Sequence, residues 1–266
     1  MEKLTDNVIL FHKAVPYGIW DDEIWTPLEC GAALREPVYD FGLRDSVEPT
    51  VDMSISEWNN LFAETTGIFF NWKHLDNKKY AGNVQYRRRF DIRTYEQLED
   101  MFKEHNVITT YPLKLQVKSQ YGRCHNVGDL EWIKEIVVRL YPDYEQDFVR
   151  YIDNGRLLWY SNGFLMREEE YADYCAWLFS ILFEFRDLKG WKCPQDVTAY
   201  VEYQIDNGLR PRLDSNRKPD NAVAYQSQIC GFLSERLFTL WLLHNYNTEK
   251  EREVLQLPYL KMEKCL

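Results

Sequence analysis

The amino-acid sequence predicts an α/β fold, a mixed sheet flanked by helices, with a helix-rich C-terminal half. The chain has 266 residues, of which 45% are hydrophobic, and this length suits one large domain. Strand-like and helix-like segments alternate over the first half, whereas helical patterns dominate the second. The strand-like run over residues 80–86 leads directly into three arginines, Arg87 to Arg89. Fixed cations at the carboxyl end of a strand are typical of α/β sheets that bind anionic ligands.

Hydrophobic periodicity and turn residues divide the first half of the chain into elements. We expect first a buried strand over residues 7–13, which Pro16 and Gly18 end. A short helix or irregular segment over 24–34 and a loop over 36–53 follow. After them we expect an amphipathic helix over 57–75, a strand over 80–86, a helix ending near residue 105 and a strand over 107–111. Ser54 with Glu57, and Thr94 with Gln97, are capping-box patterns at the two helix starts.

The second half reads mainly as helices. We expect helices over residues 129–140 and 143–154, a strand over 157–166, a long apolar helix over 168–188, a mixed polar segment over 189–228 and a final helix over 231–246. Gly155 takes the C-cap role after the second of these helices. Asn162-Gly163 interrupts the strand over 157–166.

Charge and cysteine content exclude several classes of protein. The formal net charge is −10, which argues against broad electrostatic binding of nucleic acid. The six cysteines have no Cys-x-x-Cys spacing, so we expect reduced thiols and neither a zinc site nor a disulfide framework. The first residues lack the features of a signal peptide, and no apolar run is long enough to span a bilayer. We therefore expect a cytoplasmic protein, with peripheral contact to a membrane left open.

The chain is also rich in aromatic residues, with 9 Trp, 18 Tyr and 14 Phe. Most aromatic side chains serve a hydrophobic core. Carbohydrate-binding clefts use the same residues, because the C–H faces of sugars stack on aromatic rings. The sequence leaves both interpretations open for any one ring.

A family resemblance follows from the order and spacing of four blocks. The blocks are Ser56-Glu57 with Glu64-Thr65-Thr66 through Trp72-Lys73, Tyr80 through Phe90, Asn162 through Met166 with Tyr174 through Phe179, and Gly231 through Phe238, accompanied by His12-Lys13 and Gly31 through Leu34. Together they resemble the bacterial family labelled domain of unknown function 4422, over roughly residues 7–246. No single block is highly specific, and their order carries the resemblance.

The resemblance implies a glycosyltransferase with the GT-A fold, from a family associated with capsular and exopolysaccharide synthesis. Its members are expected to transfer a hexosyl unit, by analogy galactosyl or galactofuranosyl, from a UDP-sugar to a saccharide or lipid-linked acceptor. We expect a single domain over residues 1–266, with a nucleotide-sugar-binding part over 1–125 and a helix-rich, acceptor-side part over 126–266. Acceptors of this kind lie at the inner face of the membrane.

Two positions depart from the family pattern. The family usually has a histidine at the position of Gln85, and glutamine cannot carry a proton or serve as a good metal ligand. Met53 stands where the family often has a polar residue. The first departure keeps a second interpretation open, a non-catalytic sugar-nucleotide-binding or scaffold subunit of a polysaccharide assembly complex. A nucleotidyltransferase is less favoured, because no glycine-rich phosphate loop follows the first expected strand.

Sugar transfer from a nucleotide donor requires neutralisation of the departing diphosphate. Many GT-A enzymes use a divalent metal held by an Asp-x-Asp motif, and this sequence has none. We therefore favour metal-independent neutralisation by Arg87 or Arg88, with manganese or magnesium as the alternative. Gln85 and Tyr86 precede these arginines and belong to the same expected donor site. The plainer interpretation is that the arginines only end a strand and pair with acidic surface residues.

Three further segments are candidates for the donor and sugar sites. His12 and Lys13 end the first expected strand, where they are candidates to contact base, ribose or phosphate. Glu64, on the polar side of the early helix, is a candidate to contact the donor or to hold Arg87. Asn162 and Gly163 are candidates for the sugar site, since an amide bonds hydroxyls and a glycine allows close approach. An ordinary strand end for the first pair, and a bulge in the sheet for the last, remain alternatives.

Glu235 is the candidate catalytic base. The sequence places it in the first turns of the final helix, where the helix dipole stabilises a carboxylate. An inverting transferase needs such a group to remove a proton from the acceptor hydroxyl. Arg236 is a candidate to orient Glu235 or to bind phosphate. The alternative is that Glu235 only stabilises the start of the helix.

Overall fold

The computed structural model describes residues 2–15, 21–46, 53–208, 222–246 and 253–260. Pro16 and Gly18, which we expected to end the first strand, lie outside the described residues, as do residues 47–52 of the expected loop.

A seven-stranded sheet forms the centre of the described structure. Its order is β3-β2-β1-β4-β8-β5-β9. The strands are β1 (Asp6–Phe11), β2 (Thr26–Glu29), β3 (Leu43–Arg44), β4 (Tyr80–Gln85), β5 (Val107–Thr110), β8 (Phe164–Arg167) and β9 (Val254–Leu257). Strand β8 is antiparallel to both of its neighbours, and the other pairs are parallel. Two further strands, β6 (Leu113–Lys114) and β7 (Leu157–Leu158), pair antiparallel outside this sheet.

The strand order reverses beside β1. The chain runs from β1 outward to β2 and β3 and then returns to place β4 on the other side of β1. Open α/β sheets bind ligands outside the carboxyl ends of the strands at such a switch point. The ends of β1 and β4 therefore mark the expected position of a site.

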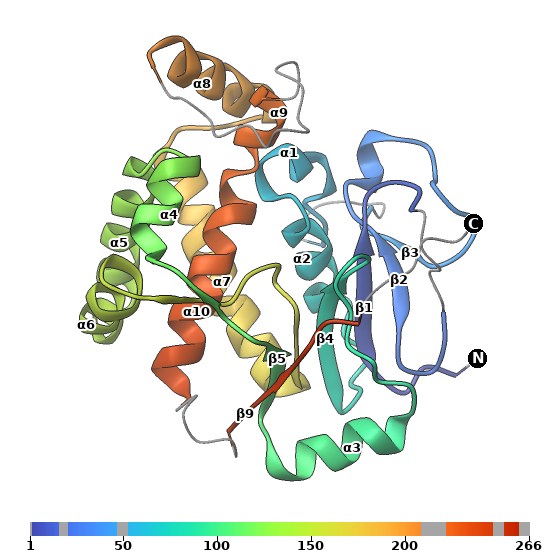
Figure 1. The fold of residues 1–266 in the computed structure, drawn as a ribbon. Coiled ribbons are helices and arrows are strands. Elements are labelled where there is room, and N and C mark those ends of the chain that lie inside the picture. The colour runs from blue at the N-terminus through green and yellow to red at the C-terminus, as the bar shows by residue number, and fades with distance from the viewer. Residues whose placement is uncertain (1, 16–20, 47–52, 209–221, 247–252, 261–266) are drawn as a thin grey trace.

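Helices pack against both faces of the sheet, as their share in the two cores shows. They are α1 (Asn59–Phe62), α2 (Thr65–Lys73), α3 (Tyr95–Glu104), α4 (Val117–Cys124), α5 (Gly128–Leu140), α6 (Glu145–Phe148), α7 (Glu168–Leu188), α8 (Pro194–Asp206), α9 (Ala222–Ser227) and α10 (Ile229–Asn245), with 3₁₀ turns at Ala32–Leu34, Ser56–Trp58 and Pro142–Tyr144 and a π-helical turn at Val149–Asp153. Figure 1 shows α4 to α7 and α10 gathered to one side of the sheet, with α3 at one end.

Alternate residues of β1 enter two separate cores, as the period of a strand requires. Val8 and Leu10 join the large core shared with α2, α7 and α10. Ile9 and Phe11 join a smaller core that includes Leu98 of α3. Among the described residues the sheet therefore packs against a core on each face.

Several expected elements are confirmed. The strands over 7–13, 80–86 and 107–111 and the helices over 129–140 and 168–188 form within one or two residues of their expected bounds. The Thr94–Gln97 capping box closes reciprocally at the start of α3. The segment over 24–34 differs from the short helix or irregular segment expected there. Its residues Thr26–Glu29 form strand β2, which pairs parallel with β1. A strand of four residues is too short for its alternating pattern to be recognised in the sequence.

The amphipathic helix expected over 57–75 is broken. Ala63 has φ 48° and ψ −131°, which ends α1 before α2 begins at Thr65. The capping box expected at Ser54 and Glu57 does not form, because the turn there begins at Ser56 without a side-chain cap. Ser54 Oγ instead donates to the carbonyl oxygen of Asp45 and accepts from the Ser56 N–H. Glycine at position 231 permits this arrangement, because a Cβ there would lie 2.8 Å from the Cβ of Ala63.

Gly155 does not act as a left-handed C-cap. It is not among the described residues of positive φ. A Cβ at this position would lie 1.7 Å from the carbonyl oxygen of Tyr151, so the glycine is needed for a close approach of the backbone after the π-helical turn. The expected strand over 157–166 is likewise split into β7 and β8, with positive φ at Ser161 and Asn162 between them.

Candidate active site

A cavity of about 310 Å³ lies at the carboxyl ends of β1 and β4. The break between α1 and α2, and helices α4, α9 and α10, form its other walls. Eight of the residues singled out from the sequence line it: His12, Glu64, Gln85, Tyr86, Arg87, Arg88, Glu235 and Arg236. Lys13, Asn162 and Gly163 do not belong to its lining.

A tight turn at the end of β4 brings both candidate arginines to the cavity. The Arg88 N–H donates to the Gln85 carbonyl oxygen at 2.9 Å, so the chain folds back after the strand. Arg87 stacks over the ring of Tyr86, and Arg88 over that of Tyr160, with guanidinium-to-centroid distances of 5.1 and 5.2 Å. Arg89 is 1% exposed and lies outside the lining. Arg87 and Arg88 therefore line one cavity, and Arg89 does not.

Gln85 links Arg88 to Glu64. Its side-chain oxygen accepts a hydrogen bond from Arg88 Nη1 at 2.9 Å, and its amide nitrogen donates to Glu64 Oε1 at 3.0 Å. The same carboxylate oxygen accepts from Asn162 Nδ2 at 3.1 Å. Each amide thus has one orientation that satisfies its partners. Glu64 is held by Gln85 and Asn162, and no hydrogen bond of the described residues joins it to Arg87, the partner that the sequence suggested.

The surroundings of Glu64 favour its protonated form. Burial raises the pKa of Glu64, and the nearby charge of Glu235 raises it further, against hydrogen bonds that act in the opposite direction. Two acidic side chains from distant segments therefore lie close together at the floor of the cavity. Their environments differ, since Glu235 has a cationic neighbour in Arg236 and Glu64 has amides.

Replacement of Glu64 by glutamine should change how stability depends on pH. The pKa of Glu64 is higher in the folded protein than its ordinary value of 4.5 in the unfolded chain. As pH rises between these two pKa values, Glu64 lowers the stability of the folded state. We expect the melting temperature of Glu64→Gln, relative to wild type, to increase from acidic to neutral pH. Thermal unfolding followed by circular dichroism across this range measures the difference, with the exposed Glu57→Gln as control. Parallel curves for wild type and Glu64→Gln would contradict the expectation.

Glu235 is held in place from two sides. Its Oε1 accepts from the backbone N–H of Ser161 at 2.6 Å, and its Oε2 from Arg236 Nη1 at 2.8 Å. Arg236 is itself buried, donates to the carbonyl of Phe232 at 2.8 Å and contacts the Gln120 amide oxygen. Helix α10 begins at Ile229, so Glu235 lies in its second turn, within the first turns where the sequence placed it. Arg236 and Ser161, more than the helix dipole, therefore fix this carboxylate.

His12 and Lys13 follow β1 at the opposite wall. His12 lines the cavity with its ring edge toward Tyr86, at a centroid distance of 5.9 Å, and Lys13 is exposed beyond it. Although much of His12 is exposed, desolvation of its ring and the positive charges of Lys13, Arg35 and Arg87 lower its pKa. The imidazole is therefore neutral at neutral pH and suited to hydrogen bonding.

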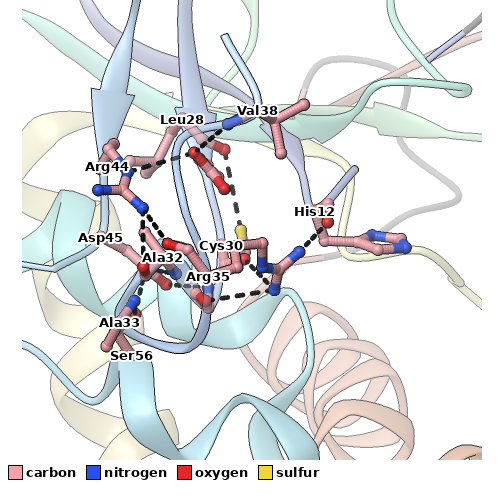
Figure 2. A network of polar contacts seen from close by, with 12 residues as sticks. His12, Leu28, Cys30, Ala32, Ala33, Arg35, Val38, Arg44, Asp45 and Ser56 are labelled. Atoms are coloured by element: carbon pink, nitrogen blue, oxygen red, sulfur yellow. Dashed lines mark hydrogen bonds and ion pairs between the residues drawn. The ribbon is translucent and has the colours of Figure 1, made fainter. Parts of the chain in front are cut away.

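A network of polar contacts fixes the backbone of this wall (Figure 2). Figure 2 shows Arg35 reaching from the loop after β2 to the carbonyl oxygen of His12, while the His12 ring points away from the network. The loop is held by Asp45, whose carboxylate accepts from the N–H groups of Gly31 and Ala32 at 2.8 and 2.9 Å and from Ser56 Oγ. The network thus positions the end of β1, and two of its members, His12 and Cys30, line the cavity.

Asp45→Ala should destabilise the protein. The substitution leaves the buried N–H groups of Gly31 and Ala32 without their acceptor, at about 1–3 kcal/mol each. For a chain of this size a loss of 2 kcal/mol lowers the melting temperature by roughly 4–8 °C. Thermal unfolding measures the shift. We expect the melting temperature of Asp45→Asn to lie between those of wild type and Asp45→Ala, and the exposed Asp40→Ala is the matched control. An unchanged melting temperature in Asp45→Ala would show that the carboxylate does not support the loop.

Asn162 and Gly163 lie beneath the cavity. Asn162 is 1% exposed and also donates to Ser234 Oγ of α10 at 2.8 Å, so it ties Glu64 to that helix. A Cβ at Gly163 would lie 2.4 Å from the Tyr259 hydroxyl, so a side chain of this protein makes the close approach there. Direct sugar contact by these two residues stays a prediction.

Comparison with known proteins places the chain in a family. Its sequence matches, over residues 7–199, the family described as Domain of unknown function (DUF4422). The chain belongs to this family. A search of curated proteins gave no match.

The structure also resembles a solved one, the apo structure of WbbM, described as a bifunctional glycosyltransferase. The TM-score is 0.66 at 20% sequence identity, over 97% of this chain and 45% of that chain. This DUF4422 chain thus spans less than half of the matched protein. The likeness confirms the expected GT-A-like α/β fold.

Sequence reasoning missed part of the cavity of this DUF4422 protein. Gln120 and His125 of the α4 region, Tyr225 of α9 and Phe232 of α10 also line it. The position of Phe232, one helical turn before Glu235 and Arg236, was a usable signal. No comparable signal marks Gln120 or Tyr225, because their position depends on how α4 and α9 dock.

Two further features of the DUF4422 chain concern metals and membranes. Over the described ranges, no three His, Cys, Asp or Glu side chains gather in a way that could hold a metal ion. Metal-independent chemistry stays a prediction. In the same ranges, every helix is too short or too polar to cross a bilayer.

Proposed function

We propose that this protein is a glycosyltransferase that transfers a hexosyl unit from a UDP-sugar to a saccharide or lipid-linked acceptor. One observation carries the proposal: two arginines and a fixed carboxylate line a single cavity at the switch point of the sheet. The cations suit a diphosphate, and the carboxylate suits an acceptor hydroxyl. Membership of the family and the fold likeness to a glycosyltransferase support the same proposal.

In the proposed reaction the acceptor oxygen attacks the anomeric carbon of the donor. The bond from this carbon to the β-phosphate oxygen breaks, and its electron pair leaves with UDP. Arg87 and Arg88 stabilise the charge that develops on the departing phosphate. The hydroxyl proton passes to Glu235, which Ser161 and Arg236 hold in a fixed position.

A donor screen tests the proposal. Purified protein is incubated with a panel of UDP-sugars that includes UDP-galactose and UDP-galactofuranose, and with octyl glycosides as acceptors. We expect one donor to raise the melting temperature, with and without EDTA, and to release UDP together with a glycosylated product. Binding without any transfer or hydrolysis would instead favour a non-catalytic sugar-nucleotide-binding subunit. Turnover only with added manganese would overturn the metal-free part of the proposal.

A further inference from the structure

The cavity has two chemically different ends. Its cationic end is formed by the turn after β4, with Arg87 and Arg88, beside the neutral imidazole of His12. Its other end is formed by α4, α9 and α10 and carries aromatic rings and side-chain amides. Glu64 and Glu235 belong to the same lining, and neither the diphosphate site nor the proton transfer proposed above uses the aromatic end.

The aromatic end is a platform of three packed rings, those of His125, Phe232 and Tyr225. The ring of His125 stacks on that of Phe232, with centroids 3.9 Å apart and planes inclined by 24°. Tyr225 meets Phe232 nearly edge-on, with centroids 4.9 Å apart. His125 is 6% exposed and its Nδ1 lies 3.1 Å from the Gln226 amide oxygen, so it supports the face of Phe232 from within. Phe232 and Tyr225 are partly exposed and line the cavity.

Polar groups accompany the rings. Gln228 lines the same end, and its side-chain amide makes no hydrogen bond to another described residue. Gln120 is fixed through its amide oxygen, which accepts from Arg236. Rings beside amides form the pattern that a sugar needs, because its C–H face is apolar and its rim carries hydroxyls.

The spacing along α10 connects this platform to Glu235. Phe232 lies three residues before Glu235, so the two side chains lie on one face, separated by ~4.5 Å along the helix. Arg236 joins the two positions, since Nη1 donates both to the Phe232 carbonyl and to Glu235. A ring of sugar size stacked on Phe232 would therefore lie within about one helical turn of Glu235 along α10.

We infer that the cavity end formed by Phe232, Tyr225, His125 and Gln228 is the acceptor subsite, and that it takes a saccharide ring stacked on Phe232. This inference rests on the proposed function. The alternative is that these rings only pack α9 against α10. Packing alone would not leave Phe232 and Tyr225 partly exposed in the wall of a polar cavity beside an amide that lacks a partner among the described residues.

Kinetics with two substrates test the inference. Initial rates are measured with the UDP-sugar identified by the donor screen and with octyl β-galactoside and octyl β-glucoside as acceptors. For Phe232→Ala we expect the acceptor KM to rise roughly 3- to 30-fold, while the donor Kd, measured by calorimetry, stays within about twofold of wild type. Phe232→Trp should recover most of the acceptor affinity. The exposed Tyr203→Ala, outside the cavity, is the matched control.

Phe232→Leu separates stacking from packing. Leucine keeps apolar volume in the wall but offers no flat ring, so an acceptor KM close to that of Phe232→Ala supports the subsite. Recovery of wild-type acceptor KM by leucine would overturn the inference, as would an unchanged KM in Phe232→Ala. A wild-type protein that binds none of the UDP-sugars would instead overturn the proposed function itself. Donor turnover that continues with an acceptor KM unaffected by Phe232→Ala would overturn only the acceptor subsite.

Discussion

Glu235→Gln is expected to reduce turnover by roughly 10²- to 10⁴-fold, the usual contribution of a positioned general base. Glutamine has nearly the same shape, and its oxygen can still accept from the Ser161 N–H that now binds Glu235 at 2.6 Å. It cannot take a proton from an acceptor hydroxyl. We therefore expect the loss in kcat, measured by UDP release, with a donor Kd close to that of wild type.

The control for this prediction is Glu202→Gln, an exposed position on α8 outside the cavity. Because Arg236 would lose its charged partner, circular dichroism should verify that the Glu235→Gln protein folds. Wild-type turnover in folded Glu235→Gln would remove this residue from the mechanism.

The second large effect concerns donor binding. Arg88→Ala should weaken the affinity for a UDP-sugar by roughly 10- to 100-fold, since hydrogen bonds to charged groups contribute about 1.5–3 kcal/mol. The loss should appear in calorimetry with EDTA present. Arg87→Ala should have a smaller effect, because Arg87 is exposed, whereas Arg88 is held by Gln85 at 2.9 Å. Arg123→Ala, exposed and outside the lining, is the matched control.

Arg88→Lys refines the same experiment. Lysine keeps the charge but has no planar fork to contact two phosphate oxygens and the Gln85 amide together. We expect an affinity between those of wild type and Arg88→Ala. Donor binding that is unchanged in Arg87→Ala, Arg88→Ala and the double variant would show that these guanidinium groups do not hold the diphosphate.

The sequence was informative wherever a local pattern was sufficient. Arg87, Arg88 and Glu235 were found because a strand end and a strong helix can be recognised from periodicity. Glu64 was found for an incomplete reason. A continuous helix was expected, but the structure breaks it at Ala63, which has a positive φ. An alanine in the sequence does not predict such a break, which the close packing against Gly231 makes possible.

Other parts depended on contacts between distant segments. Strand β9 joins the sheet beside β5 after more than 140 residues, and its four residues carry no distinct pattern. The tight turn at Gln85 made two adjacent arginines face one cavity, where an extended chain would have separated them. The aromatic platform arises only when α4, α9 and α10 come together.

The cavity combines residues that are synthesised at very different times. His12 and Arg236 are more than 200 residues apart in the chain, yet both line it. A nascent polypeptide therefore cannot form the cavity until its last long helix has left the ribosome and docked. Any ligand that contacts both walls stabilises the completed fold over every partly assembled intermediate. Saturating ligand should consequently protect the whole sheet, and not one wall alone, against proteolysis.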